Sequence, residues 1–486
     1  MYHTIKTTHS KAIADKVTDK CITFLRPLLK ELDKTLDLRL VRTLGSTITA
    51  IVRHRGRPTA LLLSELGAYL TDPEHAPAGT KRLANLVHSS RWNAQAVEDY
   101  LLEQGRHRIE KELPCSPEGR VLCILDSSVA EKAESRQIEG LAPVISAKAR
   151  RLGRPRPKMG SGYYRGPPGK PIVVPGWHWV SVLLTRWASV YERLPLTLGA
   201  WHWYTQPNPE GANSEEDIPR QREVEANWNV LSRIVAVYGK EKLLHVWDRG
   251  LANGKWLGRV LDEQWHFVVR WKKGNKLRPA TAPSVGHPET SETAREKDGV
   301  VAWRLTMRKP AWGHRQIANP RNPKQLVNVY YGAIPVYLLN REESLWLVWA
   351  RLGRETKRRR GGNEPWRLLT SEPVRTELEC WRIVEAYAAR WQIEQVLRYG
   401  KSELGIESVR VKQWEVRRKL LAIVSLAYAF LIDLVGDSTG YLLKRVLAWA
   451  HRTGRQARSA WRPLYRLRLA LSALWQRYTP NLQHFF

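Results

Sequence analysis

The chain has 486 residues, and 79 Lys and Arg against 47 Asp and Glu give it a formal net charge of +32 at pH 7. This length predicts several domains, or one domain with a large insertion, because single cores rarely grow beyond about 250–300 residues. The excess positive charge indicates a polyanionic partner. Nucleic acid is the leading candidate, because Lys and Arg displace its condensed counterions. The four cysteines include no CxxC pair, which argues against a zinc ribbon and a disulfide framework.

The sequence predicts a soluble protein of the cytoplasm that has no membrane partner. Its first residues, MYHTIKTTHSK, lack the apolar core of a signal peptide. The longest apolar run, Leu420 to Ile432, is interrupted by Ser425 and is shorter than the roughly 18 residues that a membrane span needs. We expect this run to form a buried helix. The low cysteine usage fits a reducing compartment.

The first part of the chain, to about residue 115, shows the apolar spacing of helices. The spacing is clearest between residues 13 and 29 and returns at 61–70 and 94–102, with a basic connector, ArgHisArgGlyArgPro, at 53–58. This pattern fits a helical module that reads DNA, and it fits a plain helical bundle equally well. Both interpretations stay open at this point.

Short apolar strands that end at acidic residues mark the central part. The run ValLeuCysIleLeu at 121–125 predicts a strand that ends at Asp126 and is followed by a SerSer turn. A second strand, at 242–247, ends at Asp248. Between them the sequence predicts a basic, Gly- and Pro-rich loop, two strands and a helix, at 151–171, 177–185, 194–198 and 219–238.

Strands dominate from about 256 to 371, and helices follow. The expected strands lie at 266–271, 301–307, 327–331 and 345–349. Helix resumes at about 376 and continues past Lys401. The tail, 441–486, holds nine Lys and Arg and no Asp or Glu. We expect it to face phosphate or a partner rather than to form a neutral core helix.

Asp126 and Asp248 are candidate metal ligands. Side chains at the ends of neighbouring strands can converge on one ion, and Mg²⁺ and Mn²⁺ prefer carboxylate oxygens. The alternative is that each Asp caps a turn or a helix, which is the commoner role of a single Asp.

A third acidic residue lies in a more specific pattern. Tyr387, Arg390, Glu394 and Lys401 are spaced by three, four and seven residues. At about 100° per residue they lie within roughly 60° on one helical face. That face offers a carboxylate with two cations and a phenol, which suits a phosphate backbone above metal ions. The alternative is an exposed helix with an Arg390–Glu394 ion pair.

These residues resemble the signature Tyr-x2-Arg-x3-Glu-x6-Lys of a group of bacterial insertion-sequence DDE transposases, of the cut-and-paste, hairpin-forming type. The chain matches the signature at every position, and AspArgGly at 248–250 resembles the second Asp motif of the family. The resemblance covers about residues 118 to 432. It implies a ribonuclease-H-like core in which Asp126, Asp248 and Glu394 share one site. The 146 residues between Asp248 and Glu394 (394 − 248) leave room for a β-rich insertion.

The same resemblance gives roles to two tryptophans, Trp366 and Trp391, which would handle a base flipped out of the duplex. Stacking of a free base on an indole contributes about 1–3 kcal/mol, which offsets the cost of unstacking. The chain has 22 Trp, and a packing role is the alternative for each of these two.

We therefore expect an α/β fold in which a ribonuclease-H-like mixed sheet is interrupted by a β-rich insertion. A helical DNA-binding region precedes it and a basic helical segment follows it. The expected order is DNA-binding region, first core part, insertion, second core part and C-terminal segment, at 1–117, 118–255, 256–371, 372–440 and 441–486.

The expected function is that of a transposase that binds both double-stranded element ends and target DNA as a homodimer. It would cleave the ends by two-metal hydrolysis and transesterification and join the 3′ ends to the target. Two Mg²⁺ ions, replaceable by Mn²⁺, would be held by Asp126, Asp248 and Glu394, while Tyr387, Arg390 and Lys401 contact DNA. The alternatives are a transposase-derived DNA-binding protein without strand transfer and a metal-dependent, structure-specific nuclease.

Overall fold

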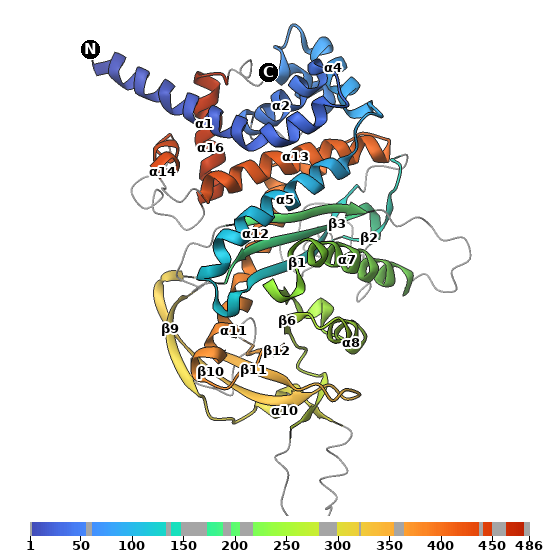
Figure 1. Ribbon diagram of the computed structural model, residues 1–486, viewed down its shortest axis with the longest axis vertical. Coiled ribbons are helices and arrows are strands. Elements are labelled where there is room, and N and C mark those ends of the chain that lie inside the picture. The colour runs from blue at the N-terminus through green and yellow to red at the C-terminus, as the bar shows by residue number, and fades with distance from the viewer. Residues whose placement is uncertain are drawn as a thin grey trace, which may run out of the picture.

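The computed structural model has helices at one end, a mixed sheet at the centre and antiparallel strands at the other end (Figure 1). The structure describes eleven stretches of the chain: 2–54, 61–132, 138–146, 173–187, 196–204, 217–280, 299–319, 322–353, 364–436, 441–449 and 463–480.

Five helices form the first part of the chain, as the apolar spacing predicts. Side chains cap two of them. Asp37 accepts hydrogen bonds from the amides of Arg39 and Leu40 at 2.9 and 3.0 Å, and Asn93 accepts one from Ala96 at 3.1 Å. Such caps satisfy the free amides of a first turn. The helices are α1 (Tyr2–Asp33), α2 (Leu38–Arg53), α3 (Leu63–Leu70), α4 (Ala76–His88) and α5 (Ala94–Glu112).

Within the described residues the strands form one twelve-stranded sheet. Its first half holds β1 (Val121–Glu131), β2 (Ala142–Ile145), β3 (Val173–Arg186), β4 (Leu196–Tyr204), β5 (Leu243–Trp247) and β6 (His266–Arg270). β1, β5 and β6 run parallel, whereas β3 pairs antiparallel with β1, β2 and β4. This mixed α/β arrangement is consistent with the expected ribonuclease-H-like core.

The second half of the sheet is antiparallel. It holds β7 (Lys276–Pro279), β8 (Val300–Val301), β9 (Gly313–Asn319), β10 (Asn322–Tyr337), β11 (Leu345–Leu352) and β12 (Trp366–Thr370). β12 pairs with β6, so these strands extend the central sheet. β6 itself follows the expected boundary at residue 256, yet it pairs in parallel with β5 of the core.

Two expectations about strands are wrong. Asp126 does not end its strand, because β1 continues to Glu131 and Ser127 and Ser128 pair with β3 instead of forming a turn. The predicted strand at 301–307 is mainly the short helix α10 (Ala302–Thr306), in which the Thr306 hydroxyl donates back to the Ala302 carbonyl at 3.2 Å. Local helical hydrogen bonds prevail there over the β propensity of the sequence. The loop expected at 151–171 lies outside the described residues.

The two faces of the central sheet carry different helices. Side chains alternate along each strand, so Leu122 and Ile124 join one apolar cluster and Cys123 and Leu125 join another. The first cluster contains α11 (Glu377–Ala389), α12 (Trp391–Ser402) and α13 (Trp414–Val435). The second contains α7 (Asp217–Tyr238) and α8 (Gly254–Asp262), and α7 confirms the helix expected at 219–238.

The apolar run at 420–432 forms the buried centre of α13, as expected. In the portions of the chain that the structure describes, no helix combines the length and the apolar character that a membrane crossing requires. α13 instead packs between the sheet and the helices of both chain ends (Figure 1).

The described part of the tail contains α14 (Tyr441–Leu447) and α16 (Pro463–Arg477). The expectation that the tail faces phosphate rather than the core is wrong for α16, whose Leu467, Leu471 and Leu474 are fully buried. Arg468 is only 2% exposed, and it donates to the carbonyls of Ile51, at 2.6 Å, and Glu403. Backbone oxygens therefore take the place of phosphate for this cation.

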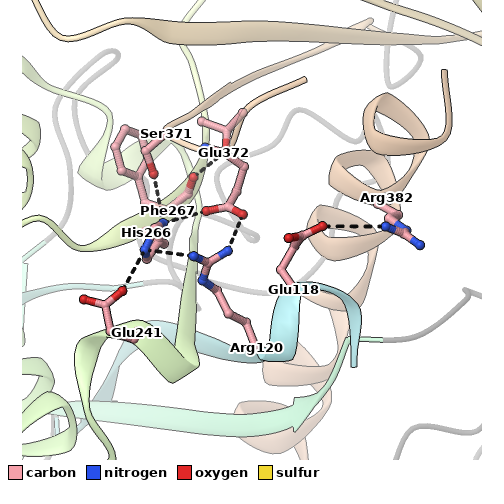
Figure 2. Close-up of polar contacts among 9 residues, drawn as sticks. Glu118, Arg120, Glu241, His266, Phe267, Ser371, Glu372 and Arg382 are labelled. Carbon is pink, nitrogen blue, oxygen red and sulfur yellow. Dashed lines mark hydrogen bonds and ion pairs between the residues drawn. The ribbon is translucent and has the colours of Figure 1, made fainter. Parts of the chain in front are cut away.

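A charge cluster centred on buried Glu372 joins three strands at the edge opposite the ends of β1 and β5 that carry the acids (Figure 2). Arg120, just before β1, donates to the Glu372 carboxylate at 2.8 Å and contacts His266 Nε2 at 3.1 Å. His266 Nδ1 lies 2.7 Å from the other Glu372 oxygen, and exposed Glu241 lies 3.6 Å from Nε2. Because the Glu372 side chain is only 4% exposed, its charge depends on these partners.

We predict that Glu372→Gln lowers the free energy of unfolding by about 3 kcal/mol, because it leaves the Arg120 guanidinium without its counter-charge. The matched control is Glu342→Gln, since Glu342 pairs with Arg278 at 2.7 Å but is 84% exposed. Its cost should stay below about 1 kcal/mol. Thermal unfolding of both variants measures the difference, and equal shifts would contradict the assigned role of the cluster.

Candidate active site

The strand register places Asp126 and Asp248 side by side. Ile124 of β1 pairs with Val246 of β5 in the parallel ladder, and each acid follows its partner by two residues (126 − 124 and 248 − 246). Two residues along a strand return a side chain to the same face. Both carboxylates therefore belong to the face that α11, α12 and α13 cover.

The segment with the third acid is helical, as expected, but it is broken once. A capping box between Thr376 and Glu379 starts α11, which ends at Ala389. Arg390 keeps right-handed helical angles (φ −53°, ψ −30°), and α12 begins at Trp391. The Arg390 amide bonds to the Tyr387 carbonyl, three residues back, at 3.1 Å, so the chain tightens at this point.

Direct contacts gather the three carboxylates around the α11–α12 junction. The Tyr387 hydroxyl donates to Asp248 Oδ1 at 3.2 Å. Arg390 Nη1 lies 3.5 Å from Asp126 Oδ2, and its Nη2 donates to Glu394. The Arg390 side chain is 14% exposed, against 30% for Asp126 and 35% for Glu394. The site is thus built on one largely buried guanidinium that contacts two partly buried carboxylates.

The electrostatics of the site show that negative charge is in excess. The pKa of Asp126 is raised to about 6: burial raises it most, the neighbouring Asp248 and Glu394 carboxylates also raise it, and Arg390 and the Ser127 amide oppose them. Burial and the Asp248 charge raise the pKa of Tyr387 to about 12, which keeps its hydroxyl a donor. For Arg390, burial lowers the pKa, but Tyr387, Asp248 and Glu394 raise it by more, so the guanidinium remains charged.

The donor set fits a divalent cation by its chemistry. Three carboxylates face a single guanidinium, and hard ions such as Mg²⁺ prefer carboxylate oxygens. The carboxylates do not converge as ligands of one ion, however: among the described residues, no three His, Cys, Asp or Glu side chains are grouped closely enough to hold a metal. The arrangement is one in which Arg390 contacts two of the three acids.

The other residues expected at the site are Trp366, Trp391 and Lys401. Trp366, at the start of β12, packs edge-on against Tyr387 with ring centroids 5.0 Å apart. Trp391 is 43% exposed, and Arg398 lies 5.9 Å from its ring centre. Lys401, near the end of α12, lies 4.0 Å from Glu407. Tyr387, Arg390 and Glu394 are brought together as their spacing predicts, whereas Lys401 lies beside Glu407 near the other end of α12.

Two charged residues near the site were missed by the sequence reasoning. Glu223 of α7 accepts a hydrogen bond from Ser127, which lies next to Asp126 but faces the opposite side of the sheet. The charge of Arg270, at the end of β6, lowers the pKa of Tyr387 and so opposes the effect of Asp248. Glu223 was missed because it lies in no recognisable sequence motif. Arg270 ends β6, which pairs in parallel with β5, the strand that precedes Asp248; this proximity is evident only from the strand register.

Replacement of Arg390 by Gln should raise the pKa of Asp126 above about 6, because the Arg390 charge that stabilises its ionised form is lost. The control is Arg398→Gln, which removes a cation of α12 that stacks on Trp391 instead. Carboxyl ¹³C shifts of Asp-labelled, metal-free protein across a pH titration report the change. An unchanged or lowered pKa in Arg390→Gln would refute the electrostatic role given to Arg390.

Residues 228–430 match the model of a known protein family, described as the transposase DDE domain. The matched segment contains Asp248, Glu394 and the whole α11–α12 junction, and it begins after Asp126. Two of the three gathered acids therefore lie in the part of the chain that resembles the family. The matched segment covers less than half of the chain, and it supports a transposase function.

Proposed function

We propose that this protein is a Mg²⁺-dependent DNA transposase of the Tyr-Arg-Glu-Lys signature group that cuts element ends and joins them to target DNA. One observation carries the proposal: Asp126, Asp248 and Glu394, from two strands and a helix, gather on one sheet face around Arg390 and Tyr387. The family match and the net charge of +32 support a DNA substrate.

Asp126, Asp248 and Glu394 are the residues that would hold two divalent ions. Bound ions would supply charge neutralisation at the attacking and leaving oxygens of the phosphodiester. Arg390 contacts Asp126 and Glu394, and its side chain must turn away from at least one of them for the carboxylates to act as ligands. Once it has turned away, the guanidinium can bind a DNA phosphate, since it can donate hydrogen bonds to two phosphate oxygens at once.

The neighbouring side chains suit the rest of the substrate. Tyr387 keeps its proton and offers a hydroxyl donor at the edge of the acidic cluster. Lys401 lies on the same helix as Glu394 and adds a cation for the phosphate backbone. Exposed Trp391 offers a ring to a base outside the duplex, and Trp366, which packs on Tyr387, is the second candidate.

The order of reactions follows the resemblance to the hairpin-forming group. Water attacks the phosphodiester at an element end and releases a 3′ hydroxyl. That hydroxyl attacks the opposite strand, which gives a DNA hairpin and frees the flanking DNA. A second hydrolysis opens the hairpin, and the 3′ hydroxyl then attacks the target strand. Pairing of two ends requires two copies of the chain, so the active complex is a homodimer.

The first test compares wild type with Glu394→Gln on labelled element-end DNA with Mg²⁺. Cleavage should fall by at least a hundredfold, because even partners one shell outside a metal typically contribute 10–100-fold. DNA binding without metal should persist. Glu415→Gln, at an exposed acid of α13, is the matched control and should cleave normally. A denaturing gel resolves nicks, hairpins and joined products.

The outcomes separate the proposal from its alternatives. Equal cleavage by wild type and Glu394→Gln would show that Glu394 is not one of the metal ligands. Binding without cleavage by the wild type would indicate a transposase-derived DNA-binding protein. Cleavage without any joined product would indicate a structure-specific nuclease.

The raised pKa of Asp126 predicts that metal binding weakens in acid. Metal ligation needs the ionised carboxylate, so protons compete with the metal below the pKa. With a pKa of about 6, Asp126 is almost fully ionised at pH 8 and about one tenth ionised at pH 5. Mn²⁺ affinity, measured from the signal of the free ion in electron paramagnetic resonance, should fall about tenfold from this group alone. A constant affinity over that range would contradict Asp126 as a ligand.

A further inference from the structure

Ser181 of β3 lies beside Asp126 and on the same face of the sheet. The two residues are partners in the antiparallel ladder between β1 and β3. Trp179 and Leu183, two positions away from Ser181 on either side, both belong to the apolar cluster on the face that carries the acids. Directly opposed residues of an antiparallel pair have Cβ atoms about 4.5–5.5 Å apart. A change of χ1 rotamer can therefore bring the Ser181 hydroxyl to the Asp126 carboxylate.

The Ser181 hydroxyl is a buried polar group with unused hydrogen-bonding capacity. The residue is 0% exposed, so bulk water does not reach it. In the described part of the chain, its Oγ has no hydrogen-bond partner. A buried hydroxyl without a partner costs free energy, because it has given up its hydrogen bonds to water. A role in the function of the site would explain why a serine, rather than an apolar residue, lies at this position.

Asp126 has two partners, and only one of them is fixed. The Ser127 amide donates to Oδ1 at 2.9 Å, and it stays in place because it belongs to the backbone of β1. Arg390 Nη1 lies 3.5 Å from Oδ2, but Arg390 also donates to Glu394. Under the proposed function Arg390 turns away from at least one of these acids. When it leaves Asp126, Oδ2 needs a new donor, because carboxylates that bind a metal are themselves held by hydrogen bonds.

We propose that Ser181 is a positioning residue for Asp126: its hydroxyl donates to the Asp126 carboxylate when Arg390 turns away and a divalent ion is bound. This role rests on the proposed function, which makes Asp126 a metal ligand. The hydrogen bond stabilises the metal-bound arrangement and not the arrangement in which Arg390 contacts Asp126. Ser181 therefore contributes to metal affinity rather than to the stability of the fold.

The test measures two properties of Ser181→Ala in the whole chain. The first is Mn²⁺ affinity at pH 8, from the signal of the free ion in electron paramagnetic resonance. It should fall about tenfold or more, because loss of a hydrogen bond to a ligating group typically costs 10–100-fold in metal affinity. The second is thermal unfolding in EDTA. The unfolding temperature should stay the same or rise, because the variant loses a buried hydroxyl that has no partner.

The matched control is Ser472→Ala in α16. Ser472 is also a buried serine, at 6% exposed, but its hydroxyl donates to the Arg53 carbonyl at 2.5 Å. This variant should unfold at a lower temperature, because a satisfied hydrogen bond is lost. It should bind Mn²⁺ as the wild type does. The two serines therefore differ in opposite ways in the two measurements.

The outcomes distinguish this role from the proposed function. Unchanged Mn²⁺ affinity in Ser181→Ala, while Asp126→Asn weakens binding, would overturn the role of Ser181 alone. A lower unfolding temperature of Ser181→Ala in EDTA would also overturn it, because the hydroxyl would then have a partner in the fold without metal. Failure of the wild type to bind Mn²⁺, or equal affinity of wild type and Asp126→Asn, would refute the metal site of the proposed function and the role of Ser181 with it.

Discussion

Mutual repulsion among Asp126, Asp248 and Glu394 is the constraint on which the centre of this molecule depends. Burial and neighbouring charge raise the pKa of Asp126, and Arg390 is the cation that opposes both effects. The guanidinium keeps its own charge because the acids and Tyr387 outweigh the cost of its burial. Under the proposed function, a bound divalent ion or a DNA phosphate would change which charges Arg390 must balance.

Strand pairing in the central sheet positions the acids of this charge cluster. Parallel pairing of β1 with β5 sets Asp126 level with Asp248, and α13 supports the face on which both lie. At the opposite edge, Arg120 and Glu372 tie the start of β1 to the end of β12. β12 leads into α11, so the ion pair also anchors the segment that carries Arg390 and Glu394. Stability and site geometry therefore share the same strands.

The two ends of the chain form one helical unit against this sheet. α16 fills its core with leucines and sends Arg468 to the carbonyl of Ile51 in α2, and Ser472 bonds to the carbonyl of Arg53. In the described part of the tail, α16 thus completes the helical region.

The sequence by itself determined the helical first part, the buried helix at 420–432 and the grouping of Tyr387, Arg390 and Glu394, because these depend on local periodicity and spacing. It did not determine where β1 ends, since pairing with β3 carries Ser127 and Ser128 onward as strand. Nor could it foresee that Arg390 interrupts the helix, or that Arg468 is buried against backbone oxygens. Only the tertiary structure decided these points, because each depends on partners that are remote in sequence.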